Sequence, residues 1–161
     1  MTGKEYNQCV EQFADRVYRF IVKNMRNNDD AQDVVQNAFE ILWKNHENVL
    51  FEKSRSYLFT VAYHNMIDQF RKKKMDSEIT DEHIQMQGNS YQFTGGKDAV
   101  ELGLSKLSEI QKTVVLLRDY EGYSYEEVGK ITGLTESQVK VYIFRARTQL
   151  KNFLVSSENA I

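Results

Sequence analysis

The 161-residue sequence has no proline, only 8 glycines and a single cysteine. Because proline and glycine interrupt helices, their scarcity predicts an all-α protein, as does the recurrence of Leu, Val, Ile and Phe at helical spacing. The lone Cys9 excludes an internal disulfide and a cysteine metal cluster. The histidines (His46, His64 and His83) lack metal-ligand spacing, so we expect neither a metal nor a cofactor.

Long apolar runs are also missing. No stretch approaches the ~18 apolar residues of a membrane span, and the N-terminus, MTGKE, contains no apolar signal region. We therefore expect a soluble, cytoplasmic protein with no direct membrane insertion.

The sequence has little net charge, and the formal value of −2 argues against a general nucleic-acid coating protein. Positive charge is nevertheless concentrated in residues 71–74 and 140–151, whereas acidic residues collect at 29–33 and 76–82. This segregation predicts DNA contacts at some surfaces and a protein partner at others.

The hydrophobic pattern divides the chain into two small helical domains, 1–75 and 99–161, joined by a flexible linker, 76–98. The first domain should hold helices at about 5–24, 31–45 and 54–74. The second should hold a helix over 98–120, interrupted near Leu107-Ser108, and the two short helices described next. The linker is expected to be mobile because it is long, acidic and glycine-containing and has no periodicity.

Near the C-terminus, the sequence predicts two short capped helices joined by a tight turn. Ser124 and Glu127 form a capping box at the start of the first helix, which ends at Gly133. Thr135 and Gln138 form a second box at the start of the next helix. Such a helix-turn-helix unit places its second helix in a DNA major groove.

That second helix has one apolar stripe, formed by Val139, Ile143, Ala146 and Leu150. Its opposite face carries Ser137, Val141, Phe144, Arg145 and Thr148, with Gln138, Lys140 and Lys151 at the margins. The basic and amide side chains near the start suit base edges, while Arg147 and Lys151 suit phosphates. An ordinary helical hairpin with a solvated polar face would show the same pattern. Evidence from other segments is therefore needed to choose between a DNA-binding unit and a hairpin.

Two helices of the first domain are amphipathic in different ways. In the helix from Ala31 to about Asn45, the inward stripe is predicted to be Val35, Ala38 and Leu42. The acidic residues at its start are explained by capping and the helix dipole rather than by a metal site. In the 54–74 helix, two arcs suit a core, namely Leu58, Val61 and Ala62, and Phe59, Tyr63, Met66 and Phe70. The remaining arc is polar and consists of Tyr57, Thr60, His64, Asp68 and Arg71.

Three segments together resemble bacterial RNA polymerase sigma factors of the extracytoplasmic-function group. Residues 30–43 are similar to the family's polymerase-clamp-binding helix. Residues 57–68, with the basic run that follows, resemble its helix for the −10 promoter element. Residues 107–150 resemble its module for the −35 element. The three motifs also stand in the family's order and spacing.

The resemblance implies two partners, core RNA polymerase and promoter DNA, and three sets of site residues. The polymerase-binding set is Asp33, Gln36, Asn37 and Glu40. The −10 set is Tyr57, Thr60, His64, Arg71, Lys72 and Lys73. The −35 set is Ser137, Gln138, Lys140, Val141, Tyr142, Phe144 and Arg145. Tyr57 and His64 suit unstacked bases, and the lysines suit phosphates. The family's loop for a flipped base would place Phe51 to Ser54 as secondary candidates.

The chain departs from the family pattern at three places. Ser108 stands where a proline is common, Tyr63-His64 replaces a typical Arg-Asn pair, and Val141-Tyr142 replaces Ser-Arg. Because the last two affect positions expected to touch DNA, the family's promoter sequences do not transfer to this chain.

The first hypothesis is therefore a sigma factor that binds core polymerase, directs it to promoters and assists opening, without enzymatic activity. The family often has an anti-sigma factor, which would be a further partner. The second hypothesis is a stand-alone helix-turn-helix transcription regulator. The third, a metal-dependent hydrolase using the aspartate cluster, is weak because clustered His and Cys and a glycine-rich phosphate loop are missing from the sequence.

Overall fold

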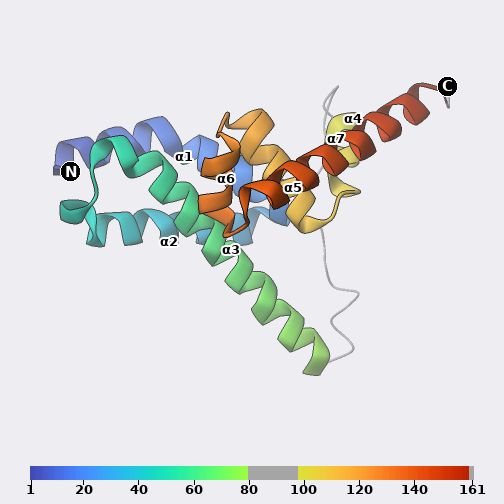
Figure 1. Ribbon diagram of the computed structural model, residues 1–161. Helices are drawn as coiled ribbons and strands as arrows, with labels where there is room; N and C mark the ends of the chain where they lie inside the picture. Colours follow the sequence, from blue (N-terminus) through green and yellow to red (C-terminus); the bar gives the residue numbers. More distant parts are fainter. Residues whose placement is uncertain (80–97, 160–161) are drawn as a thin grey trace. The chain divides into compact units, whose positions relative to one another are not determined.

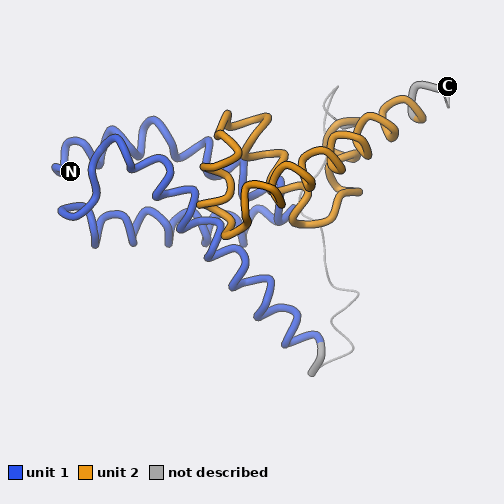
Figure 2. The backbone as a smooth tube through the Cα atoms, in the orientation of Figure 1, with its two compact units in different colours: residues 1–91 blue, residues 92–161 orange. Residues whose placement is uncertain are grey.

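The fold is all-α. The computed structural model describes residues 1–79 and 98–159, which form helices and turns without a strand (Figure 1). The chain divides into two compact units, Met1–Tyr91 and Gln92–Ile161 (Figure 2). The predicted fold class, with a helix-turn-helix in the second unit, is confirmed. Residues 80–97, which hold most of the predicted linker, lie outside the described residues.

Unit 1 is built from three mutually packed helices, α1 (Gly3–Met25), α2 (Asn28–Lys44) and α3 (Ser54–Ile79). Two 3₁₀ turns, η1 (His46–Asn48) and η2 (Phe51–Lys53), connect α2 to α3. The largest fully buried side chains of this unit are Val17, Phe20, Ile21, Val34, Leu42, Leu58, Phe59 and Met66. The aromatic rings of Phe20 and Phe59 meet at 5.3 Å between centroids, which joins α1 to α3.

The short α1–α2 connection is formed by local backbone chemistry. Arg26 adopts a left-handed conformation, with φ of 55°, and ends α1. Asn27 then caps α2, because its side-chain oxygen accepts the Asp30 backbone N–H at 3.0 Å. The run Asn27-Asn28-Asp29-Asp30, which interrupts the hydrophobic pattern, therefore supplies the cap.

Two details of the predicted core were wrong. On α2 the inward residue is Val34, which is fully buried, whereas Val35 is only half-buried. The two neighbouring valines fit a helical stripe almost equally well, and the packing of α2 on α1 and α3 selects the first. On α1, the hydrophobic spacing predicts an inward stripe that begins at Val10. Val10 is 37% exposed, so the buried part of that stripe is shorter.

Helix α3 is longer than predicted and continues past Lys74 to Ile79. Both proposed apolar arcs contribute to the core, because Leu58, Phe59, Ala62, Tyr63 and Met66 are all buried. Residues 71–76, which follow Phe70 on this helix, are all exposed.

Unit 2 contains α4 (Asp98–Ser105), α5 (Glu109–Val115), a π-helical turn (Leu116–Tyr120), α6 (Tyr125–Thr132) and α7 (Glu136–Asn159). The interruption expected near Leu107-Ser108 is present, and Ser108 caps α5 reciprocally with Gln111. The buried core of this unit consists of Leu104, Leu107, Val114, Val115, Leu116, Leu117, Tyr123, Val128, Ile131, Val139, Ile143 and Ala146.

The helix-turn-helix forms as the sequence predicts. Both capping boxes are present, with hydrogen bonds of 2.9–3.1 Å between each cap residue and its partner. Gly133 ends α6 with φ of 82°, a conformation that glycine adopts without strain. Helix α7 extends well past Leu150, which is half-buried.

Candidate nucleic-acid interface

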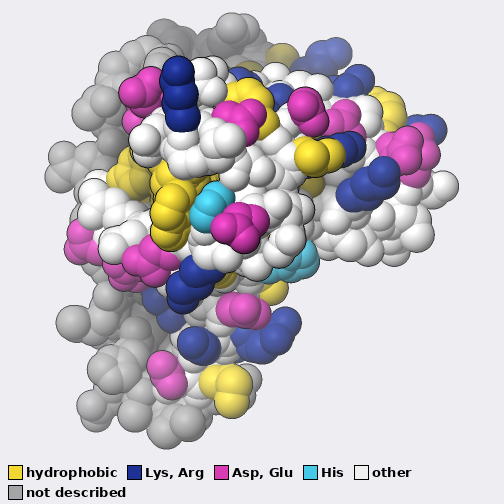
Figure 3. All heavy atoms as spheres, turned by 90° about the vertical axis from the view of Figure 1, so that its left-hand side faces the viewer, with side chains coloured by type: hydrophobic (Ala, Val, Ile, Leu, Met, Phe, Trp, Pro, Cys, Tyr) yellow, Lys and Arg dark blue, Asp and Glu magenta, His cyan; other side chains and the backbone are white. Residues whose placement is uncertain are grey.

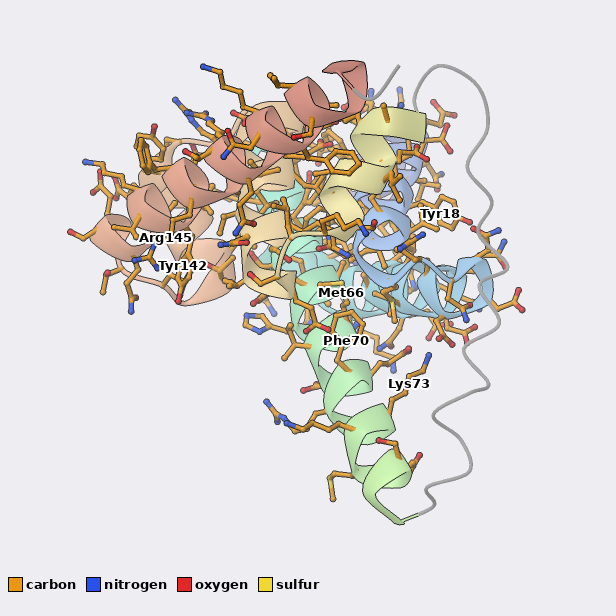
Figure 4. The ribbon with its side chains drawn as sticks, turned by 90° about the vertical axis from the view of Figure 1, so that its right-hand side faces the viewer. Tyr18, Met66, Phe70, Lys73, Tyr142 and Arg145 are labelled. Atoms are coloured by element: carbon orange, nitrogen blue, oxygen red, sulfur yellow. The ribbon has the colours of Figure 1, made fainter. Side chains whose placement is uncertain are left out.

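The outer face of α7 is open to solvent. The five residues predicted on it, Ser137, Val141, Phe144, Arg145 and Thr148, are all exposed, Phe144 to 72%. Tyr142 and Arg145 project from the first half of the helix (Figure 4). The exposed Phe144 ring and its sequence neighbour Arg145 offer both apolar and charged contacts to a DNA groove.

The candidate base-contacting side chains of α7 differ in whether they already interact with another group of the protein. Lys140 lies 3.6 Å from the Glu136 carboxylate and 5.6 Å from the centre of the Tyr125 ring. The Gln138 side-chain oxygen accepts the Thr135 backbone N–H at 2.9 Å. Arg145 is exposed, and no ion pair in the described part of the chain includes it. Arg145 is thus the readiest of these side chains for a new contact.

The sequence predicts that Arg147 suits a DNA phosphate, but in the structure its guanidinium already has an anionic partner. Its Nε and Nη2 donate to the two Asp119 carboxylate oxygens at 3.0 and 2.5 Å. These hydrogen bonds raise the pKa of the Arg147 guanidinium above its ordinary value. The pairing joins residues 28 positions apart, so sequence spacing gave no signal for it.

On α3, the polar arc is only partly accessible. His64, Asp68 and Arg71 are exposed, whereas Tyr57 and Thr60 are half-buried. The Tyr57 hydroxyl accepts a hydrogen bond from the Asn45 side chain at 3.2 Å. The Thr60 hydroxyl donates to the Ser56 carbonyl at 2.7 Å.

The basic run of α3 is exposed but not uniform. Lys73 pairs with the Asp30 carboxylate at the start of α2, and the Arg71 guanidinium lies 3.9 Å from Asp68. Lys72 is exposed. Met66, Phe70 and Lys73 follow one another along one side of α3 (Figure 4), so this side changes from core to charged surface.

The secondary candidates before α3 need one correction. Ser54 is fully buried, its hydroxyl donates to the Phe51 carbonyl at 2.7 Å, and it accepts the Cys9 thiol hydrogen at 3.0 Å. A hydroxyl held in this way is inaccessible to an extruded base. Glu52 and Lys53 are exposed.

The predicted polymerase-binding residues share the outer face of α2. Asp33, Gln36, Asn37 and Glu40 are all exposed, and the Gln36 amide donates to Glu40 at 3.4 Å. This face presents carboxylates and amides with no packing role in unit 1.

Beside that face lies an aromatic surface that the sequence did not reveal. Trp43 is 48% exposed and stacks on the His46 ring at 4.3 Å between centroids, and the Tyr6 ring lies tilted at 5.0 Å from that of Trp43. A shallow groove of about 510 Å³ lies beside Tyr6 and Trp43 and is lined by Gly3, Tyr6, Asn7, Glu40, Trp43 and Lys44. Partial burial, Cys9 and Glu40 raise the pKa of the Tyr6 hydroxyl. Only the tertiary packing of α1 on α2 brings Tyr6 to Trp43.

Charges of both signs are interspersed on the face shown in Figure 3. At its lower end, where α3 projects, several Lys and Arg side chains lie among acidic ones. In the described ranges, no three His, Cys, Asp or Glu side chains are grouped to hold a metal ion, and no helix there is long and apolar enough to cross a bilayer. The accessible chemistry is that of an interaction surface.

Two families match successive parts of this chain. Sigma-70 region 2 matches residues 9–75, and Sigma-70, region 4 matches residues 97–150. The matches together define a two-region transcription initiation factor of the sigma-70 class.

Curated relatives and solved structures agree with this class. The chain is 27% identical over 139 residues to RNA polymerase sigma factor SigV of Bacillus subtilis, covering 86% of this chain and 84% of that protein. It is 29% identical over 165 residues to the ECF sigma factor SigW of the same organism, covering 92% and 88%. Its fold is similar to that of the sigma factor RpoE of Bartonella quintana, solved with the anti-sigma factor NepR, with a TM-score of 0.80 at 22% identity, covering 94% and 97% of the two chains. The chain belongs to the extracytoplasmic-function group of the sigma-70 family.

Proposed function

We propose that this chain binds core RNA polymerase, directs it to specific promoters and assists strand opening. The matches to both sigma-70 regions carry the proposal. Support also comes from the helix-turn-helix of unit 2, whose second helix exposes a complete outer face. A factor of this kind lends specificity to the polymerase and performs no covalent chemistry itself.

Roles for the individual surfaces follow from their chemistry. The outer face of α2, comprising Asp33, Gln36, Asn37 and Glu40, would contact the polymerase. Unit 1 would meet the opened −10 strand through the polar arc of α3, with Tyr57, Thr60 and His64 near bases and Arg71, Lys72 and Lys73 near phosphates. The outer face of α7 would contact the −35 element through Ser137, Gln138, Lys140, Val141, Tyr142, Phe144 and Arg145.

We place the protein in the cytoplasm, where its polymerase and DNA partners are. An anti-sigma factor is also among its proposed partners, because RpoE, its structural neighbour, was solved with the anti-sigma factor NepR.

Run-off transcription with core polymerase, with and without this protein, tests the proposal most directly. The expected result is a promoter-specific transcript that depends on both components. Footprinting of the isolated protein at the same promoter provides the control, because a sigma factor should bind weakly alone. A strong footprint without polymerase and no stimulated transcript would instead indicate a stand-alone regulator.

A further inference from the structure

A bidentate ion pair links α7 to the turn that precedes α6. Two nitrogens of the Arg147 guanidinium donate to the two carboxylate oxygens of Asp119, at 3.0 and 2.5 Å. Bidentate guanidinium–carboxylate pairs are directional, because both planar groups must align. The pair therefore constrains the orientation of α7 as well as its distance from the turn.

Asp119 is held in a well-defined turn. It lies in the π-helical segment Leu116–Tyr120, which the Glu121 N–H closes by donating to the Leu116 carbonyl at 3.1 Å. Gly122 then takes φ of 78°, and the Arg118 guanidinium donates to the Tyr123 carbonyl at 2.9 Å. These contacts define the backbone that carries Asp119, so its carboxylate can serve as a reference point for another helix.

The first residue of α6 joins the same cluster. The Tyr125 ring has the Arg118 guanidinium 4.6 Å from its centre and the Lys140 ammonium 5.6 Å from it. After the larger effect of Asp119, Tyr125 also raises the pKa of the Arg147 guanidinium. These contacts connect the π-helical turn through Arg118, the start of α6 through Tyr125, and α7 through Lys140.

The apolar stripe of α7 does not by itself fix the exact rotation and axial position of the helix, and the cluster around Asp119 can fix both. Val139, Ile143 and Ala146 are buried and fix which face of α7 points inward. Apolar contacts are non-directional, so they tolerate small rotations and shifts along the helix. Direct base contacts depend on placement within the groove, and a directional pair at Arg147, two residues past Arg145, restricts that placement.

We propose that Asp119 and Arg147 are positioning residues for −35 recognition, and that Arg147 is committed to Asp119 instead of a DNA phosphate. The inference rests on the proposed function of unit 2. Both side chains are partly exposed, 36% for Asp119 and 47% for Arg147, so substitutions at either should leave the chain folded.

The test uses the full chain with core polymerase and two promoters, one with an intact and one with a scrambled −35 element. The variants are Asp119→Asn, Arg147→Gln and the charge swap D119R/R147D. Lys130→Gln is the matched control, because Lys130 is an exposed, ion-paired cation of unit 2 that belongs to none of the proposed contact sets. Binding is measured over a range of salt concentrations.

Each single substitution should reduce the preference for the intact element on the order of tenfold, within the range of one lost base contact. The slope of log K against log salt should stay unchanged, because no phosphate contact is lost. The charge swap should restore at least half of the lost preference. Without DNA, hydrogen exchange in α7 should be faster in the single variants than in the wild type. The charge swap should reverse this increase.

Three results would overturn the inference. Arg147→Gln could weaken binding to both promoters equally and reduce the slope of log K against log salt by about one unit, which would identify a phosphate contact. Asp119→Asn could strengthen binding, which identifies a carboxylate that shields the cation. Single variants could behave like the wild type. If the wild-type protein itself shows no −35 preference, the proposed function fails, and the hydrogen-exchange result still reports separately on the ion pair.

Discussion

Lys73 on α3 forms an ion pair with Asp30 in the first turn of α2. The pair joins the basic run of α3 to the acidic start of α2, the preceding helix. It means that one of the lysines proposed to hold DNA phosphate already has an anionic partner within the protein.

Replacing Asp30 by Asn should release Lys73 for phosphate contact. If Lys73 lies at the DNA, the salt-dependence slope of the polymerase–promoter complex should steepen by up to about one unit. Asp29→Asn is the matched control, because Asp29 is an exposed neighbour with the same charge. Equal effects of both changes would point to general electrostatics rather than to Lys73.

Reversing charge on the outer face of α2, with Asp33→Lys and Glu40→Lys together, should weaken assembly with core polymerase. Because both side chains are exposed, the thermal unfolding temperature should change little. Glu11→Lys with Asp15→Lys makes the same charge change on exposed positions of α1. Unaltered co-purification of the α2 variant with core would remove this face from the interface.

His64→Ala should impair −10 strand opening more than closed-complex formation, because His64 is the exposed aromatic residue of the polar arc. Permanganate reactivity of −10 thymines reports opening, and a gel-shift assay reports binding. Tyr57→Phe retains the ring and removes only the hydrogen bond from Asn45, so it should change opening little. Equal loss of both steps in the His64 variant would indicate a structural role.

Arg145→Ala should cost about 1–3 kcal/mol of promoter binding and relax the preference at a single −35 base pair, because Arg145 is free to bind a base edge bidentately. Gln149→Ala, an exposed neighbour on α7, serves as the control. The measurement is binding to a panel of −35 variants. A uniform loss across the panel would assign Arg145 to phosphate, and no loss would place it outside the interface.

Gly129→Ala should destabilise unit 2, because the added Cβ would lie 2.8 Å from the Leu134 carbonyl oxygen. The helix-turn-helix would have to open, at a cost of about 1–3 kcal/mol. Gly3→Ala is the control, since its Cβ would make only an ordinary 3.9 Å contact with Trp43. Equal denaturant midpoints for the two variants and the wild type would show that the turn relaxes without strain.

The sequence by itself determined the local structure of this protein. Capping boxes at Ser108, Ser124 and Thr135 and the glycine after α6 act within a few residues, so their geometry follows from residue type and spacing. The apolar stripe of α7 is decided in the same way, and it also defines which side chains form the outer face.

Only the tertiary structure decided which polar side chains are already engaged. Val34 rather than Val35 enters the core because α2 packs on α1 and α3. Ser54 is buried beside Cys9 because the start of α3 packs on α1. The pairs Lys73–Asp30 and Arg147–Asp119 join residues 43 and 28 positions apart. No periodicity links such residues, because their proximity arises only when separate helices pack against each other.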